Sequence, residues 1–267
     1  VDFGATDVPM NAEELARARQ AVLQIPVTLG GAAIAYNLPG VTGLRLSRQV
    51  VADIYLGKIT KWNDPRIASL NKSVKLPDMP IVVVHRSDGS GTSYIFTDFL
   101  SHVSPEWKSK VGTGKSVSWP APSAVGAKGN EGVAGQVRST PGAIGYVELA
   151  YVIENKMDAA VLQNRAGKWV TISPEAVAAA AASKPEVSAT NFSIVDAGAA
   201  DAWPVSGYSW VVVYRDQQNK DRAKILYNVL AWLVGSQGQD NAKSVDYVPL
   251  PRNVQDTASH TLNEMQR

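Results

Sequence analysis

The chain has 267 residues, no cysteine and a formal net charge of +2, because 26 lysines and arginines nearly balance 24 aspartates and glutamates. At roughly 150 residues per domain, this length predicts about two domains and a core that needs no disulfide or metal to fold. The absence of cysteine excludes a disulfide scaffold and cysteine-ligated metal sites, and three histidines without metal-motif spacing argue against a histidine-rich metal site. The balanced charge argues against a nucleic-acid-binding protein.

Helix and strand patterns alternate along the chain. In chain order they are a helix over residues 11–23, a strand over 27–37 broken at Gly30 and Gly31, a helix after Ser47, a strand over 81–85, a helix over 92–103, a short helix over 132–139, a strand over 143–147, an alanine-rich helix after Ser173, a strand over 210–214 and a helix over 221–234. Asn11, Ser47 and Ser173 stand where N-caps are expected. This alternation predicts an α/β protein with largely parallel sheets. Since no linker separates two domains, we expect the chain to cross between them more than once.

The most informative stretch is residues 85–93, His-Arg-Ser-Asp-Gly-Ser-Gly-Thr-Ser, between a buried strand and a helix. A glycine-rich turn at a helix N-terminus points backbone N–H groups at a ligand, and the helix dipole favours an anion. Ser90 and Thr92 add hydroxyl donors, Arg86 adds a fork matched to a tetrahedral oxyanion, and Asp88 could hold that fork. The same residues also fit a simple capped helix, and the loop alone does not decide between the two interpretations.

Three other patterns are weaker. Residues 109–116 nearly match a phosphate-binding P-loop, but Ser109 replaces the first glycine and the flanking strand and helix are missing. Residues 126–132 form a second glycine-rich turn, which favours an ordinary strand-to-helix connection over a cleft wall. Ser90 could serve a hydrolase as nucleophile, but it lacks the spacing of a nucleophile elbow, and His85 is expected to be packed in its strand.

Several stretches together carry a family resemblance. They are residues 1–7, 53–62, 86–93, 111–114, 128–132 and 141–148. Over these stretches, and along the chain to about Pro251, the sequence closely resembles the phosphate-binding proteins of bacterial phosphate-specific ABC transporters. The resemblance implies a type II periplasmic binding protein fold, with mixed, mostly parallel sheets in two lobes and a ligand cleft between them. The first lobe would contain residues 1–26 and 203–267, and the second residues 27–202.

The resemblance also implies the site and the function. Asp7 looks like the carboxylate that accepts the phosphate proton, Arg86, Ser90, Gly91 and Thr92 look like the donors, and Asp88 would brace Arg86. The protein would be a periplasmic receptor, or a lipid-anchored extracytoplasmic one, that delivers phosphate to transmembrane permease subunits without catalysis or cofactor. The alternatives are a receptor for another oxyanion, sulfate or molybdate, and a phosphatase-like enzyme using Ser90.

The family pattern also has a strand–helix–strand unit before Asp2, with Gly-Ala-Thr-Phe-Pro and Ser-Ser-Gly loops that occur nowhere in this sequence. We therefore expect the first lobe to lack roughly 50 residues, the size of such a unit with its connections. Without them, the strand at residues 1–5 would present an unpaired edge and an uncovered apolar face. A protein of these 267 residues would then bind phosphate weakly or not at all, and would be poorly soluble or associated.

Overall fold

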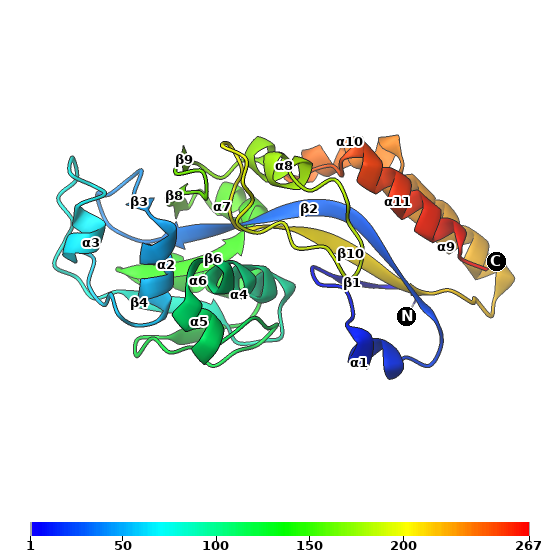
Figure 1. The fold of residues 1–267 in the computed structure, drawn as a ribbon, viewed down its shortest axis with the longest axis horizontal. Helices are drawn as coiled ribbons and strands as arrows, with labels where there is room; N and C mark the ends of the chain where they lie inside the picture. Colours follow the sequence, from blue (N-terminus) through cyan, green and yellow to red (C-terminus); the bar gives the residue numbers. More distant parts are fainter. Residues whose placement is uncertain (1, 267) are drawn as a thin grey trace.

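A computed structural model describes residues 2–266, so Val1 and Arg267, the outer ends of the predicted first lobe, lie outside the described residues. A mixed sheet of seven strands runs through the middle of the molecule (Figure 1). In sheet order its strands are β1 (Gly4–Thr6), β10 (Ser206–Tyr214), β2 (Val22–Tyr36), β6 (Ala143–Glu148), β4 (Val82–Arg86) and β5 (Val125–Ala127), with β7 (Asp158–Ala159) also paired to β2. A second, small sheet contains β3 (Arg45–Leu46), β8 (Val161–Gln163) and β9 (Trp169–Val170).

Helices alternate with the strands, which confirms the predicted α/β class. They are α1 (Ala12–Ala16), α2 (Arg48–Tyr55), α3 (Pro65–Ala68), α4 (Gly91–Val103), α5 (Pro105–Lys110), α6 (Gly129–Ser139), α7 (Leu149–Asn155), α8 (Pro174–Ala182), α9 (Lys220–Val234), α10 (Ser236–Ala242), the 3₁₀ helix η1 (Lys243–Val245) and α11 (Arg252–Asn263). The three predicted N-caps are confirmed, since the side chains of Asn11, Ser47 and Ser173 each accept a backbone hydrogen bond from the first turn. None of the helices in the described range has the length and hydropathy of a membrane span.

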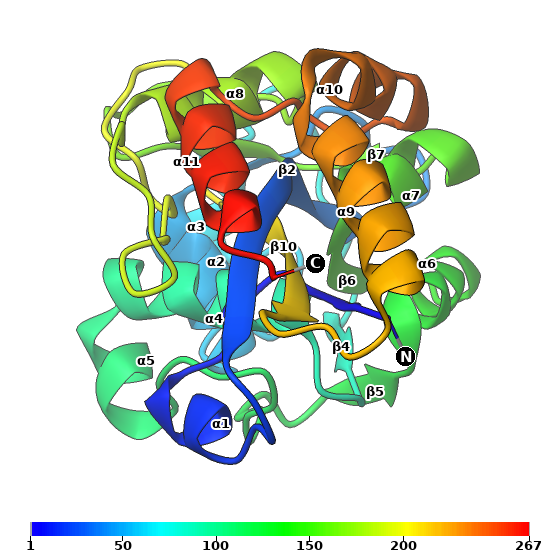
Figure 2. The same cartoon turned by 90° about the vertical axis from the view of Figure 1, so that its right-hand side faces the viewer.

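The long strand β2 links two parts of the molecule. Its residues 22–31 pair with β10, whereas its residues 32–36 pair with β6 and in part with β7. Figure 1 shows β2 and β10 running from the end that holds α2, α4 and α5 to the end that holds α9 and α11. At that second end α11 packs on β2 with α9 beside it (Figure 2). The pairing partner changes between Gly31 and Ala32, and the predicted lobe boundaries at 26/27 and 202/203 stay a prediction.

The expectation of largely parallel sheets is wrong. Five of the eight strand pairings among the described residues are antiparallel, including every pairing of β2 and β10. In the seven-stranded sheet the recorded parallel pairings are those of β4 with β5 and of β4 with β6. Parallel neighbours need a crossover connection, and the segment with α4 and α5 provides one between β4 and β5. The alternation of helices and strands does not reveal that the two longest strands run in opposite directions.

The predicted helix over residues 11–23 is also wrong in its second half. The helix α1 ends at Ala16, and Val22 and Leu23 belong to β2. The helix buries none of its residues, while Leu23 is buried in the sheet. Burial against β10 therefore outweighs the helical spacing of the apolar residues.

Gly30 and Gly31 do not break β2, contrary to expectation. They serve close approach instead, because a Cβ atom at Gly31 would lie 2.6 Å from Cγ2 of Val177 on α8. A Cβ atom at Gly30 would lie 2.7 Å from the Glu148 carboxylate. These glycines let a helix and a buried side chain pack directly on the strand backbone.

An aromatic cluster holds α4 against the sheet. It contains Tyr55, Phe96, Trp119 and Tyr146, and the rings of Phe96 and Tyr146 stack with centroids 4.5 Å apart. The Tyr146 hydroxyl accepts a hydrogen bond from the Arg86 N–H at 3.0 Å and lies 2.6 Å from the Ser93 hydroxyl. Buried hydroxyls need such partners. The cluster thereby fixes the end of β4 relative to the start of α4, where the informative loop lies.

The strand β1 lies at one edge of the seven-stranded sheet, and the predicted unpaired edge and uncovered apolar face stay predictions. Among the described strands β1 pairs only with β10. Phe3 beside it is exposed, and so are Ile225, Val229 and Trp232 along α9. The expected association in solution stays a prediction.

Candidate functional site

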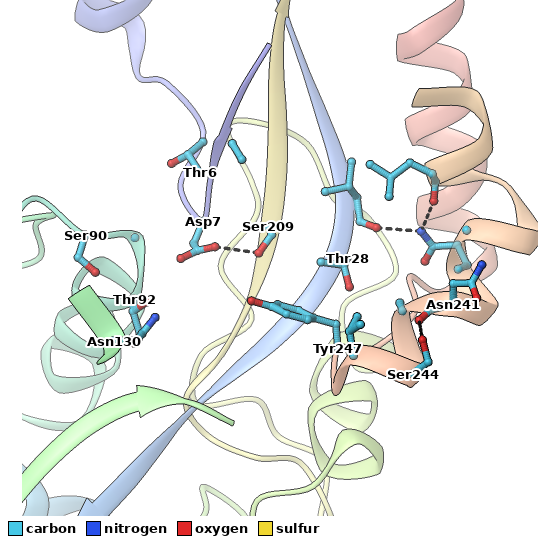
Figure 3. Close-up of a pocket in the computed structure, with 18 of the residues that line it drawn as sticks. Thr6, Asp7, Thr28, Ser90, Thr92, Asn130, Ser209, Asn241, Ser244 and Tyr247 are labelled. Atoms are coloured by element: carbon cyan, nitrogen blue, oxygen red, sulfur yellow. Dashed lines mark hydrogen bonds between the residues drawn. The ribbon is translucent and has the colours of Figure 1, made fainter. Parts of the chain in front are cut away.

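A cavity of about 730 Å³ opens between the end of β1, the N-terminus of α4 and the segment that contains α10 and η1 (Figure 3). Every ligand-binding residue predicted from the sequence lines it, namely Asp7, Arg86, Ser90, Gly91 and Thr92. Its walls also contain Ser209 and Tyr247, which the sequence did not single out, and Lys115 and Asn130 from the two weaker glycine-rich stretches. Asp7 and Arg86 are about 80 residues apart in the sequence, and the fold brings both to this cavity.

The N-terminus of α4 presents unpaired donors to this cavity. Ser90 is the N-cap, and its hydroxyl oxygen accepts the Ser93 N–H at 3.1 Å. Among the described residues, no acceptor is recorded for the N–H groups of Gly91 and Thr92, which begin the helix. Such donors together with the helix dipole attract an anion.

Arg86 lies at the end of β4 and is held in place by Asp88. The Arg86 Nε and a terminal nitrogen donate to the two Asp88 carboxylate oxygens at 2.8 and 2.7 Å. The Asp88 carboxylate also accepts the Gly129 N–H at 3.1 Å. These bonds, with that of Arg86 first, hold the pKa of Asp88 well below its usual value. The guanidinium is therefore oriented before any ligand arrives.

Asp7 follows β1 and reaches the opening of α4. A Cβ atom at Gly91 would lie 2.5 Å from the Asp7 Cβ and 2.7 Å from its Oδ2, so only glycine fits there. The Ser209 hydroxyl donates to Asp7 Oδ1 at 2.8 Å (Figure 3). Burial raises the pKa of Asp7, although the Ser209 hydrogen bond, the Arg86 charge and the Thr92 hydroxyl oppose that effect.

A second buried carboxyl, Glu148, lies behind the site at the end of β6 and was missed by the sequence reasoning. Its side chain accepts a hydrogen bond from the Thr92 hydroxyl at 3.4 Å. Burial and the neighbouring Asp7 charge raise the pKa of Glu148 to about 8. No local pattern could have identified Glu148, because its partners lie just after β1, on α4 and on β2, far away in the chain.

The structure shows where the weaker sequence candidates lie, namely the P-loop-like segment, the second glycine-rich turn and the possible nucleophile Ser90 with His85. The P-loop-like segment begins in the last two residues of α5, and its Lys115 pairs with Glu14 of α1 at 2.8 Å. Residues 126–132 join β5 to α6 as expected, and Asn130 of that turn also lines the cavity. His85 is half-buried and stacks on Trp119, and its Nδ1 lies 2.9 Å from the Arg86 carbonyl. Within the described range, no side-chain base is recorded in hydrogen-bond contact with the Ser90 hydroxyl, and no group of three or more His, Asp or Glu side chains could hold a metal ion.

Comparisons with known proteins agree with this architecture. Residues 1–237 match the model of the PBP superfamily domain. The phosphate-binding protein PstS of Pasteurella multocida is 46% identical over 258 residues, a match that covers 95% of this chain and 74% of that protein.

Two solved structures show the same fold. A high-affinity periplasmic phosphate-binding protein bound with phosphate superposes with a TM-score of 0.75 at 20% identity, covering 100% of this chain and 84% of that one. The phosphate-binding protein of Stenotrophomonas maltophilia superposes with a TM-score of 0.72 at 21% identity, covering 97% and 79%. The predicted periplasmic binding protein fold is thereby confirmed, and the chain belongs to the PBP superfamily and, within it, to the family of PstS phosphate-binding proteins.

Proposed function

We propose that the protein binds inorganic phosphate in this cavity through Asp7, Arg86, Ser90, Gly91 and Thr92, with Asp88 as the brace of Arg86. The proposal rests on one observation: a single hydrogen-bond acceptor, the Asp7 carboxylate, lies among several hydrogen-bond donors. The Asp7 carboxylate lies against the N-terminus of α4, whose first N–H groups have no recorded acceptor within the described residues. The Arg86 fork lines the same cavity.

This arrangement selects for a protonated oxyanion. Arg86, the hydroxyls and the helix N–H groups satisfy unprotonated ligand oxygens, whereas Asp7 needs a ligand O–H to donate to it. Phosphate keeps at least one proton at neutral pH, and sulfate keeps none. A sulfate or molybdate receptor is therefore disfavoured. A phosphatase using Ser90 is disfavoured as well, because that hydroxyl caps α4 and accepts the Ser93 N–H.

The partners and the location follow from the family. We infer that the protein works outside the cytoplasmic membrane, free in the periplasm or anchored by a lipid, and delivers phosphate to the permease subunits of an ABC transporter. The relative in Pasteurella multocida is named a phosphate-binding protein, and one structural neighbour is described as periplasmic. Both descriptions fit a receptor that binds its ligand without transforming it.

Calorimetric titration of Arg86→Ala tests the proposal. The substitution removes a bidentate partner from a buried anion and should weaken phosphate binding by about 2–5 kcal/mol. Arg86→Lys should recover only part of the loss, because an ammonium group lacks the fork. The exposed Arg138→Ala, on α6, serves as the matched control and should bind like the parent. Equal affinities for Arg86→Ala and the parent would refute the site.

A further inference from the structure

Glu148 occupies the place where β2 changes partners. It is the last residue of β6, pairs with Ala32, and has only 7% of its surface exposed. Its N–H donates to the Asn130 side-chain oxygen at 3.3 Å. One carboxylate oxygen lies against the Gly30 backbone, where a Cβ atom would come within 2.7 Å. The side chain is therefore enclosed between the crossing strand and the cavity.

The Glu148 carboxyl has few partners for a buried charge. Among the described residues, the one hydrogen-bond donor recorded for it is the Thr92 hydroxyl, at 3.4 Å, and it forms no recorded ion pair. The titratable groups that face it are Asp7 after β1, Arg86 on β4 and Tyr247 after η1. Arg86 already donates to Asp88, so its charge is largely compensated. A carboxylate in this position would cost much free energy.

Thr92 connects this carboxyl to the binding site. Its hydroxyl contacts Glu148 and also interacts with the Asp7 carboxyl, whose pKa it lowers. A threonine hydroxyl has a single proton to donate and can accept at its oxygen. If Glu148 is ionised, it takes that proton and Thr92 has none for an anion in the cavity. If Glu148 is protonated, it donates to Thr92, and the threonine proton is free for the ligand.

We propose that Glu148 is a positioning residue that binds a proton whenever the site binds phosphate, and that its O–H group directs the Thr92 hydroxyl toward the ligand. The inference rests on the proposed function. Protonated Glu148 also removes one negative charge beside Asp7 and the incoming dianion. Asp7 accepts the Ser209 hydroxyl at 2.8 Å, whereas the hydrogen bond recorded for Glu148 is the longer one from Thr92 at 3.4 Å, so the proton resides on Glu148.

Protonation of Glu148 links phosphate affinity to pH. Because burial and Asp7 raise the pKa of Glu148 to about 8, the proton is present at neutral pH and is lost above about pH 8. Inorganic phosphate loses its second proton near neutral pH but keeps the remaining one between about pH 8 and about pH 9.5, and the hydroxyl pKa of Tyr247 lies higher, at about 12. A fall in affinity between about pH 8 and about pH 9.5 therefore reports on Glu148 rather than on the ligand.

Calorimetric phosphate titrations across this pH range, with Glu148→Gln and Glu154→Gln, test the proposal. The parent and the exposed control Glu154→Gln should lose affinity on the order of tenfold by about pH 9.5. Glu148→Gln should stay flat, because its amide donates to Thr92 at every pH. A parent without this loss, or a Glu148→Gln variant with the same loss, would overturn the inference while leaving phosphate binding intact. No phosphate binding at pH 7, by the parent alone or with a family-like N-terminal segment added, would instead refute the proposed function.

A second measurement uses the parent protein alone, so it does not require that the Glu148→Gln variant folds. Carboxyl ¹³C NMR of the parent reports the protonation of Glu148 directly. We expect phosphate to shift the titration midpoint of this carboxyl upward, since the dianion disfavours a second negative charge nearby. A Glu148 carboxyl that is ionised at about pH 7 in the phosphate complex would overturn the inference, whatever the affinities show.

Discussion

Single atoms decide selectivity at the residue scale, and Asp7 is the clearest case. Its carboxylate accepts the Ser209 hydroxyl and can accept one more proton from a ligand. We predict that Asp7→Asn reduces the preference for phosphate over sulfate, because the amide can donate to an unprotonated oxygen. A site built around one required hydrogen bond can reject an analogue lacking it by about 10⁴–10⁵. Competition titrations that return the parental selectivity ratio would show that Asp7 is not the proton acceptor.

Gly91 offers a second test at this scale, with its own control in the same loop. Gly91→Ala would bring a methyl group to 2.5 Å from the Asp7 Cβ, whereas a Cβ atom at Gly89 meets nothing within 4 Å. Gly91→Ala should therefore separate Asp7 from the α4 N-terminus and weaken phosphate binding by more than tenfold, an effect of about 1.4 kcal/mol or more. Gly89→Ala should bind normally. Equal affinities of the two variants would mean that the site tolerates a looser contact.

At the scale of elements, the ion pair between Lys115 and Glu14 connects α1 with the segment after α5, whose Lys115 lines the cavity. Both side chains are 36% exposed, so the pair contributes no more than about 1 kcal/mol. We predict that Lys115→Gln raises the phosphate dissociation rate by less than about fivefold, and more clearly at low salt. Lys110→Gln, which removes an exposed pair within α5, is the control. Stopped-flow release rates that do not differ between the two variants would show that this contact has no part in retaining the ligand.

Local signals predicted elements well where they depend on near neighbours. The caps at Asn11, Ser47 and Ser173 need only the next three residues, and all three are confirmed. Val22 and Leu23 were assigned to a helix because their spacing is helical, but burial against β10, nearly 200 residues later, makes them a strand. The antiparallel direction of β2 and β10 has the same origin, since no local pattern encodes it.

The binding site divides in the same way. The loop that contains Arg86, Ser90 and Thr92 is contiguous, so the sequence identifies it, and the family resemblance adds Asp7. Ser209 and Glu148 contact that set from β10 and β6, through pairings that only the fold creates. Glu148, the residue to which we assign the proton, was therefore not identified as functional by any motif.

For the whole molecule, these carboxyls give the stability a defined pH dependence. Folded Glu148 keeps its proton up to a pKa of about 8, whereas in the unfolded chain it loses the proton near its ordinary pKa of 4.5. Between these values the folded state binds more protons, so the free energy of unfolding falls as pH rises. Asp88 acts in the other direction, because Arg86 lowers its pKa, and the stability it contributes is lost only in acid below about pH 3.8.

We therefore predict that the protein is more stable at about pH 5 than at about pH 8, and that Glu148→Gln removes much of this difference. The amide is neutral at both pH values and fills the same space, so only the titration is lost. Urea unfolding at the two pH values measures the difference, with the exposed Glu154→Gln as the control that should keep the parental slope. If Glu148→Gln retains that slope as well, the buried carboxyl does not hold a proton in the folded state, and the decline with pH arises elsewhere in the molecule.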